Sequence, residues 1–201
     1  GRIMIRPEEF TGNFLLESIT IPESVKHIGE DAFANCKNLS EVIISDNVFN
    51  IDSGAFSNCE SLGEIFIPNS VTNIGADAFH GCKNLNKINI SNKVVILEKG
   101  VFGGCENLNE ITIPYGMINI GDGAFEECKS LREVSIPDNV ASIGDYAFWN
   151  CQSLNQITVW SNVTSIGYSA FDGYKNLTIR AFKGSYAERY ALENEIPFEE
   201  I

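Results

Sequence analysis

The chain has 201 residues, of which 44% are apolar, so it is long enough to bury one large core or one repeat array. Its 27 acidic residues outnumber its 14 basic residues, for a net charge of −13, and no cluster of Lys or Arg offsets that excess. This balance argues against nucleic acid and anionic membranes as partners. No apolar run approaches the roughly 20 residues of a membrane-spanning helix, so we expect no insertion into a membrane.

Three residue types recur in steps of 23 along the chain. Eight of the 13 phenylalanines follow this step, namely Phe10, Phe33, Phe56, Phe79, Phe102, Phe125, Phe148 and Phe171. The cysteines are Cys36, Cys59, Cys82, Cys105, Cys128 and Cys151, and the leucines run from Leu16 to Leu177. A common period in three residue types predicts a solenoid in which each unit is one coil stacked on the next.

One unit reads I-P-x-x-V-x-x-I-G-x-x-A-F-x-x-C-x-x-L-x-x-I-x-I. One copy is carried by Ile67, Pro68, Val71, Ile74, Gly75, Ala78, Phe79, Cys82, Leu85, Ile88 and Ile90. The L-x-x-I-x-I segment has strand periodicity, which predicts one strand per coil and a parallel sheet. The V-x-x-I segment favours a short extended piece, and the apolar spacing of three in A-F-x-x-C indicates a short helical turn on the opposite, convex side.

This unit resembles the BspA-like class of leucine-rich repeats, which occurs in many bacterial surface proteins. The resemblance covers about residues 3–180. It implies a right-handed, horseshoe-like α/β solenoid with the parallel sheet on its concave face. It also implies a cell-surface or secreted protein with a role in protein binding or adhesion, with extracellular host or matrix proteins among the expected partners.

At the N-terminus, Ile5 and Phe10 already occupy repeat positions, so the chain begins inside a unit and shows no signal peptide. Either a longer array has been cut, or a strand from Ile3 to Ile5 closes the end. With that end open, we expect a monomer or a weak dimer formed through it.

We expect the repeat array to occupy residues 1–181, as seven to eight units with the first incomplete, and a C-terminal cap to occupy residues 182–201. Ser185 and Glu188 have capping-box spacing, which predicts a helix over residues 185–194. Such a helix would shield the last open coil.

Two repeat positions vary together along the array. The proline position reads Pro22, Ser45, Pro68, Ser91, Pro114, Pro137 and Trp160. The glycine position seven residues later reads Gly29, Asp52, Gly75, Glu98, Gly121, Gly144 and Gly167. In the first five units, each Pro is followed by Gly and each Ser by an acidic residue. Because Gly permits positive φ and Pro fixes φ, we hypothesise that the pair jointly sets the path of the loop.

No constellation for catalysis is visible. The six cysteines sit at an inward position, one per coil, so we expect buried free thiols and neither disulfides nor a zinc site. His27 and His80 lie at different repeat positions, and we expect both at the surface. The sequence also lacks hydrolase, phosphate-loop and dinucleotide motifs. We therefore predict no enzymatic activity, no cofactor and no metal.

The outward positions of the strands are the candidate site. One outward ladder is mostly acidic, with Lys87 breaking the run, and another is polar apart from Ile43 and Phe66. The candidate ligand-binding residues are Glu41, Ile43, Glu64, Phe66, Lys87, Asn89, Glu110, Thr112, Glu133 and Trp160. A second group of expected surface aromatics gathers toward the C-terminal half, namely Tyr115, Tyr146, Trp149, Trp160 and Tyr168. The acidic ladder would suit a basic partner, and aromatic surfaces suit glycans or Pro-rich peptides.

The leading interpretation is a non-catalytic module for protein binding or adhesion, with a protein or glycan ligand on the concave face. A structural spacer in a longer surface protein is the first alternative. An intracellular scaffold, which would fit reduced cysteines, is the second.

Overall fold

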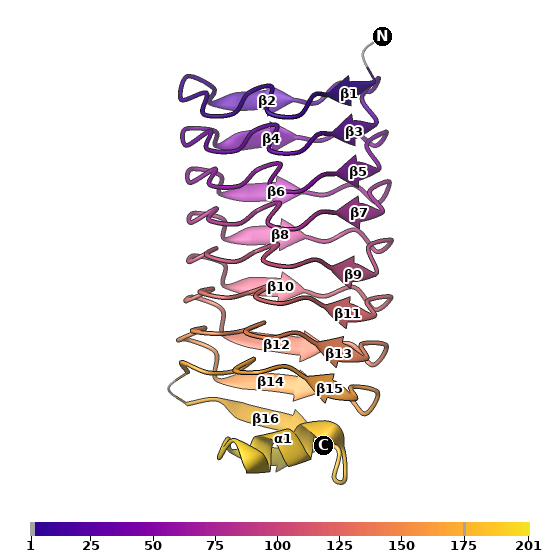
Figure 1. Cartoon of the computed structure of the whole chain (residues 1–201), viewed down its shortest axis with the longest axis vertical. Helices are drawn as coiled ribbons and strands as arrows, with labels where there is room; N and C mark the ends of the chain where they lie inside the picture. The colour runs from indigo at the N-terminus through magenta and orange to yellow at the C-terminus, as the bar shows by residue number, and fades with distance from the viewer. Residues whose placement is uncertain (1–2, 175) are drawn as a thin grey trace.

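The protein is a parallel β-solenoid of about nine turns that ends in a helix. The computed structural model describes residues 3–174 and 176–201, and Figure 1 shows the coils stacked along one axis. Each complete coil contributes a longer strand to one side, the long-strand sheet, and a two-residue strand to a second side, the short-strand sheet.

The long-strand sheet contains β2 (Ser18–Thr20), β4 (Glu41–Ile43), β6 (Glu64–Phe66), β8 (Lys87–Asn89), β10 (Glu110–Thr112), β12 (Glu133–Ile136), β14 (Gln156–Val159), β16 (Thr178–Ala181) and β17 (Phe198–Glu200). The short-strand sheet contains β1 (Met4–Ile5), β3 (His27–Ile28), β5 (Asn50–Ile51), β7 (Asn73–Ile74), β9 (Ile96–Leu97), β11 (Asn119–Ile120), β13 (Ser142–Ile143) and β15 (Ser165–Ile166).

Pairing in both sheets is parallel and in register from coil to coil. In the long-strand sheet, Glu64 faces Lys87 and Lys87 faces Glu110, and each strand buries its central residue while the flanking residues point outward. Strand pairing is interrupted between β4 and β6, between β10 and β12, and between β7 and β9. At the last of these breaks the N–H of Glu98 donates to no described carbonyl, whereas Gly75 and Gly121 donate to the preceding coil at 2.8 Å.

The predicted helical turn on the convex side is not present in the described residues. In its place the N–H groups of Asp31, Phe33 and Asn35 donate to carbonyls of the following coil at 2.7–3.0 Å. Asp31 and Asn35 have φ of 50° and 59°, far from the −63° of an α-helix. Because alternate N–H groups bond the neighbouring coil, they cannot close the bonds four residues apart that an α-helix needs.

The repeating phenylalanines form one continuous stack through the core. All eight rings lie nearly parallel to their neighbours, with interplanar angles of 1–22° and centroids 5.1–5.8 Å apart. From Phe33 to Phe171 the side chains are fully buried. This stack is the inward ladder that the 23-residue period predicts.

The cysteines form a second inward ladder beside the phenylalanines, and all six are buried and free, as the sequence predicts. Each thiol donates to the carbonyl of a phenylalanine in the preceding coil, as Cys59 does to Phe33 at 3.2 Å and Cys105 to Phe79 at 3.3 Å. Burial raises the pKa of Cys105 and of Cys151 to about 12. The thiols are therefore protonated hydrogen-bond donors within the core.

The glycine position has a different role from the one expected. None of Gly29, Asp52, Gly75 or Glu98 has a positive φ, so the idea that Gly supplies such a conformation here is wrong. A Cβ on Gly29 would instead lie 2.7–2.9 Å from the backbone of the preceding coil. Glycine therefore fits Gly29 because two backbones approach closely there, whereas the coils with Asp52 and Glu98 accommodate a side chain at the same repeat position.

The position two residues later does have a positive φ, and it alternates between Asp and Gly in the same coils. Asp31 and Gly54 occupy it in successive coils, as do Asp77 and Gly100, with φ of 50–63°. The carboxylate of each Asp fills the space that a Cβ would need in the glycine of the following coil. At this position the two-coil period is thus matched by side-chain packing between neighbouring coils.

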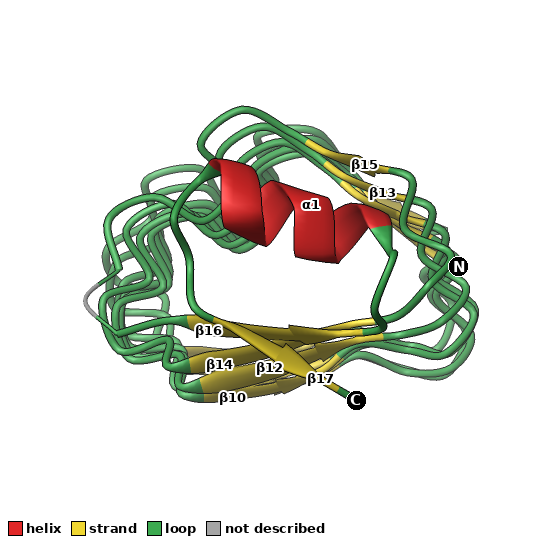
Figure 2. Ribbon diagram, turned by 90° about the horizontal axis from the view of Figure 1, so that it is seen from below, coloured by secondary structure: helices red, strands yellow, loops and turns green. Residues whose placement is uncertain are grey.

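The C-terminal cap consists of α1 (Tyr186–Glu193) and β17, and Figure 2 shows α1 lying across the end of the last coil. Ser185 caps the helix by accepting from the N–H of Glu188 at 3.1 Å, as the sequence predicts. Tyr190 closes the phenylalanine stack with an edge contact to Phe171 at 5.8 Å. The strand β17, which the sequence did not reveal, adds one further parallel strand beside β16.

Phe79→Ala tests the stack. It removes a buried ring between two neighbours, so we expect a loss of about 3–5 kcal/mol in the free energy of unfolding. The matched control is Phe66→Ala, because Phe66 is 65% exposed, and this change should stay within about 0.5 kcal/mol. Urea unfolding followed by circular dichroism measures both, and equal losses would contradict a stack that stabilises the core.

Gly75→Ala tests the close approach of the coils. The new Cβ would lie 2.8 Å from the carbonyl carbon of Asp52, so we expect a destabilisation of about 1–3 kcal/mol. Gly63→Ala is the control, since the nearest atom to its added Cβ is 3.9 Å away. If both variants unfold at the wild-type urea concentration, steric need does not explain glycine at this position.

The thiol ladder predicts a clear difference in reactivity. At pH 8 the folded protein should not react with a soluble thiol reagent, because its cysteines are buried and protonated. In concentrated urea all six cysteines should react. Mass spectrometry of the labelled protein counts the modified cysteines, and rapid labelling of Cys82 or Cys105 in the folded state would contradict the ladder.

Candidate functional site

The outer face of the long-strand sheet is hollowed over β4, β6, β8 and β10. The hollow has a volume of about 1050 Å³. Eight of the predicted site residues line it, namely Glu41, Ile43, Glu64, Phe66, Lys87, Asn89, Glu110 and Thr112. Parallel pairing brings them together, because residues at the same repeat position become direct neighbours on adjacent strands.

A second hollow of about 520 Å³ follows on the same face, toward the C-terminus. It is lined by Tyr115, Ser135, Pro137, Asp138 and Trp160, and it shares Ile111 and Thr112 with the first hollow. The two hollows adjoin at these shared residues, and we call the two together the long groove. The ninth predicted residue, Trp160, lies here, whereas Glu133 is exposed on β12 and lines neither hollow.

Each end of the long groove carries exposed apolar side chains. Ile43 is 52% exposed and Phe66 is 65% exposed at one end. At the other end Tyr115 is 70% exposed, and Trp160 packs against Phe182 with ring centroids 5.8 Å apart. Exposed apolar groups of this size in a hollow are typical anchors for a ligand.

Asn89 has a structural role within the groove. Its side-chain amide donates to the carbonyl of Ile67 at 3.0 Å and accepts from the N–H of Ile67 at 3.0 Å. These bonds use the amide nitrogen and the amide oxygen to tie β8 to Ile67, which directly follows β6 in the preceding coil. The residue shapes the groove, and its side chain is not free to turn toward a ligand.

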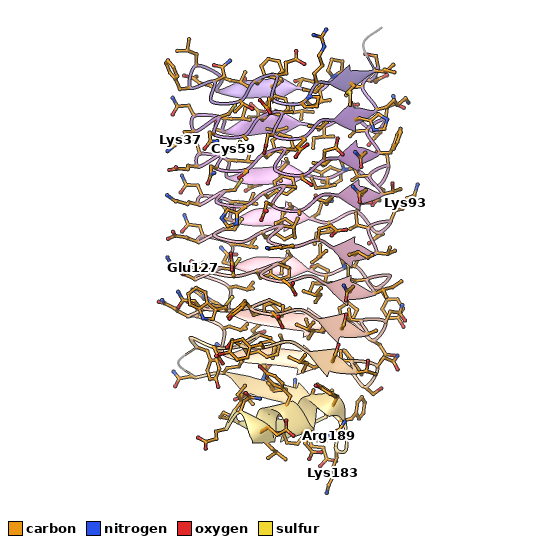
Figure 3. All side chains as sticks on the ribbon, in the orientation of Figure 1. Lys37, Cys59, Lys93, Glu127, Lys183 and Arg189 are labelled. Atoms are coloured by element: carbon orange, nitrogen blue, oxygen red, sulfur yellow. The ribbon has the colours of Figure 1, made fainter. Side chains whose placement is uncertain are left out.

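Glu41, Glu64 and Glu110 give the groove a net negative charge, although Lys87 lies between Glu64 and Glu110 on adjacent strands. Among the described residues, Glu41, Glu64 and Glu110 form no ion pair, and neither does Lys87. On another edge of the stack the charges do pair, as Lys37 and Lys83 do with Glu60 at 3.0 and 3.7 Å. Figure 3 shows Lys37 and Glu127 along this edge. The negative charge in the groove therefore remains available to a partner.

The other aromatic residues predicted at the surface do not join the groove. Tyr146 and Tyr168 contact each other edge to face, with centroids 5.6 Å apart. Neither of them, nor Trp149, lines either hollow. The aromatic group suggested by the sequence thus divides into a groove pair, Tyr115 and Trp160, and a separate set.

The sequence did not identify several groove residues. Asn69, Asn92 and Asp138 come from the loops that follow the long strands, and Ser135 is an outward strand residue without a distinctive side chain. The repeat positions of the loop residues could have indicated them. How closely these loop residues approach the strand face depends on the path of each loop, and the repeat pattern does not encode that path.

The titratable groups elsewhere are dispersed. Among residues 3–174 and 176–201, no group of three or more His, Cys, Asp or Glu side chains is placed to hold a metal ion. His27 packs edge to face on Phe49 at 4.4 Å, and His80 lies 3.9 Å from Asp77 in a separate hollow of about 490 Å³. No helix in the described part of the chain is long and apolar enough to cross a membrane.

Comparison with solved structures finds bacterial leucine-rich repeat proteins. A protein from Eubacterium ventriosum has a TM-score of 0.73 and 31% identity over 79% of this chain and 43% of its own, so this chain spans less than half of its length. A T. pallidum leucine-rich repeat protein has a TM-score of 0.59 and 25% identity, over 98% of this chain and 78% of its own. A leucine-rich repeat protein from Bacteroides ovatus has a TM-score of 0.53 and 26% identity, over 99% of this chain and 75% of its own. No curated protein matches the chain.

A family profile agrees with these structural matches. The profile described as "BspA type Leucine rich repeat region" matches six copies, over residues 3–114 and 72–195. These ranges cover nearly all of the described coils and extend into the cap. With its 23-residue coils, parallel strands and continuous phenylalanine stack, the chain belongs to the BspA type leucine-rich repeat family.

Proposed function

We propose that this chain is a non-catalytic module that binds a partner protein, or mediates adhesion through one, along the long groove. The observation that carries the proposal is the exposed pair Ile43 and Phe66 beside unpaired glutamates in the groove. Rigid strands hold these side chains in place, so little conformational entropy is lost when a partner binds. Family membership supports the same class of function.

We also propose that the protein acts at the cell surface or after secretion. Support comes from the family, whose members occur in many bacterial surface proteins. A non-catalytic role is supported by the chemistry of the described residues. The thiols are buried in the core with raised pKa values, and the two histidines lie apart from them and from each other.

The double variant Ile43→Thr, Phe66→Thr tests this function. Thr20, Thr112 and Thr158 stand at the same repeat position, so the change should leave the fold intact. The wild-type protein should bind at least one member of a panel of purified extracellular-matrix proteins. The double variant should bind it at least tenfold more weakly, because central apolar anchors contribute most of the binding energy.

The control is Ile118→Thr, which removes a side chain that is also 52% exposed but does not line the groove. Its dissociation constant, measured by biolayer interferometry, should equal that of the wild type. Unchanged binding by the double variant would contradict the proposed site. Binding to a glycan array but to no protein would contradict a protein partner, and binding to neither would favour a structural spacer.

A further inference from the structure

The long groove has two apolar ends separated by a polar middle. Ile43 and Phe66 lie at the end nearer the N-terminus, and Tyr115 and Trp160 lie at the other. The two hollows adjoin at Ile111 and Thr112, which line both. A ligand that fills the groove therefore has to run across the coils, along the axis of the stack.

The separation of the two ends follows from the spacing of the coils. Stacked phenylalanine rings place neighbouring coils 5.1–5.8 Å apart, and Phe66 and Trp160 belong to coils four steps apart. The two anchors are thus about 20 Å from each other along the stack. An extended chain advances about 3.3 Å per residue, so about six residues span this distance.

The middle of the groove favours a positively charged chain with free backbone groups. Glu64 and Glu110 face it without ion pairs, and Asp138 adds a carboxylate near the far end. The hydroxyls of Thr112 and Ser135 form no hydrogen bond with any described residue, so they can bond the backbone of a ligand. Lys87 lies between the two glutamates but leaves the lining acidic overall, in a protein of net charge −13.

The geometry points to a specific class of partner. We propose that the groove binds an extended, basic segment of the partner protein, with two large apolar side chains about six residues apart. One side chain packs on Ile43 and Phe66, and the other packs between Tyr115 and Trp160. Lysine or arginine between them faces Glu64 and Glu110. This inference rests on the proposed function, because it assumes that the long groove is the protein-binding site.

Binding along the axis differs from the addition of a strand to the sheet. The strands β6, β8 and β10 are hydrogen-bonded to one another, and the groove lies on their outer face. That face presents side chains, with the central residue of each strand buried and the flanking residues outward. Recognition therefore depends on the spacing and charge of the partner's side chains and not on a shared backbone ladder.

The test uses fluorescent synthetic peptides of equal length and composition. Each carries one Trp and one Leu, separated by two, five or nine residues drawn from Lys, Ser and Gly, with two lysines in every spacer. Fluorescence anisotropy should give at least tenfold tighter binding for the five-residue spacer than for the other two. The affinity should also fall as salt is added, because the glutamates are exposed to solvent.

Single-anchor variants determine whether both ends act together. Phe66→Thr and Trp160→Pro each restore a residue found at that position in other coils, and each should remove the preference for the five-residue spacer. The double variant Glu64→Gln, Glu110→Gln should weaken binding and flatten its salt dependence. Glu23 is an exposed acid outside the groove, so the control variant Glu23→Gln should change neither the affinity nor its salt dependence.

The outcomes separate this inference from the proposed function. Equal affinity for all three spacers, or a preference that survives both single-anchor variants, overturns the two-anchor segment. If matrix proteins still bind in a manner that needs Ile43 and Phe66, the proposed function stands and only the two-anchor segment is overturned. If neither the peptides nor the proteins bind, both fall.

Discussion

Each coil of this protein satisfies its hydrogen-bonding groups mainly through the coils on either side. The strands pair in parallel, the turn N–H groups reach the following coil, and each thiol bonds a phenylalanine carbonyl of the preceding coil. A single coil would leave these groups without partners, so it could not be stable alone. The same bonds fix the spacing between coils, and that spacing determines which side chains fit inside: one ring, one thiol and one leucine per step.

A uniform interior leaves the outward positions free to differ. On one edge of the stack, Lys37, Glu60 and Lys83 alternate in sign and pair across successive coils. The pairing with Lys37 lowers the pKa of Glu60. In the long groove, the glutamates remain without such partners beside exposed apolar groups. What distinguishes the groove is that acidic side chains lie beside exposed apolar groups in a hollow.

Most of the fold follows from the sequence because each repeat packs the same residue types at the same positions as its neighbours. The period located the phenylalanine stack, the thiol ladder and the strands, and Ser185 identified the start of the capping helix. The sequence wrongly predicted a helical turn near Asp31. An apolar spacing of three does not show whether the backbone N–H groups bond within their own coil or to the next one. The strand β17 lacked a repeat signature, since it belongs to the cap.

The candidate site was predictable only in part. Outward strand positions such as Glu64 and Phe66 follow directly from alternation, and they do line the groove. The hydrogen bonds between the Asn89 side chain and the backbone of Ile67 could not be inferred from the sequence, because Asn is as plausible as Thr at an outward strand position. The second hollow depends on how the loop carrying Asp138 bends toward the strand face, and this depends on contacts between coils.

The packing of Asp31 over Gly54 and of Asp77 over Gly100 has a consequence for how such an array changes length. Loss of the coil that carries Gly54 would bring Asp31 and Asp77 into the same space, whereas loss of the coils that carry Gly54 and Asp77 together would place Asp31 over Gly100. Two successive glycines are tolerated, as Gly100 and Gly123 demonstrate. In this part of the array, the effect of losing a coil therefore depends on which coil is lost, because the Asp of one coil occupies the space left by the Gly of the next.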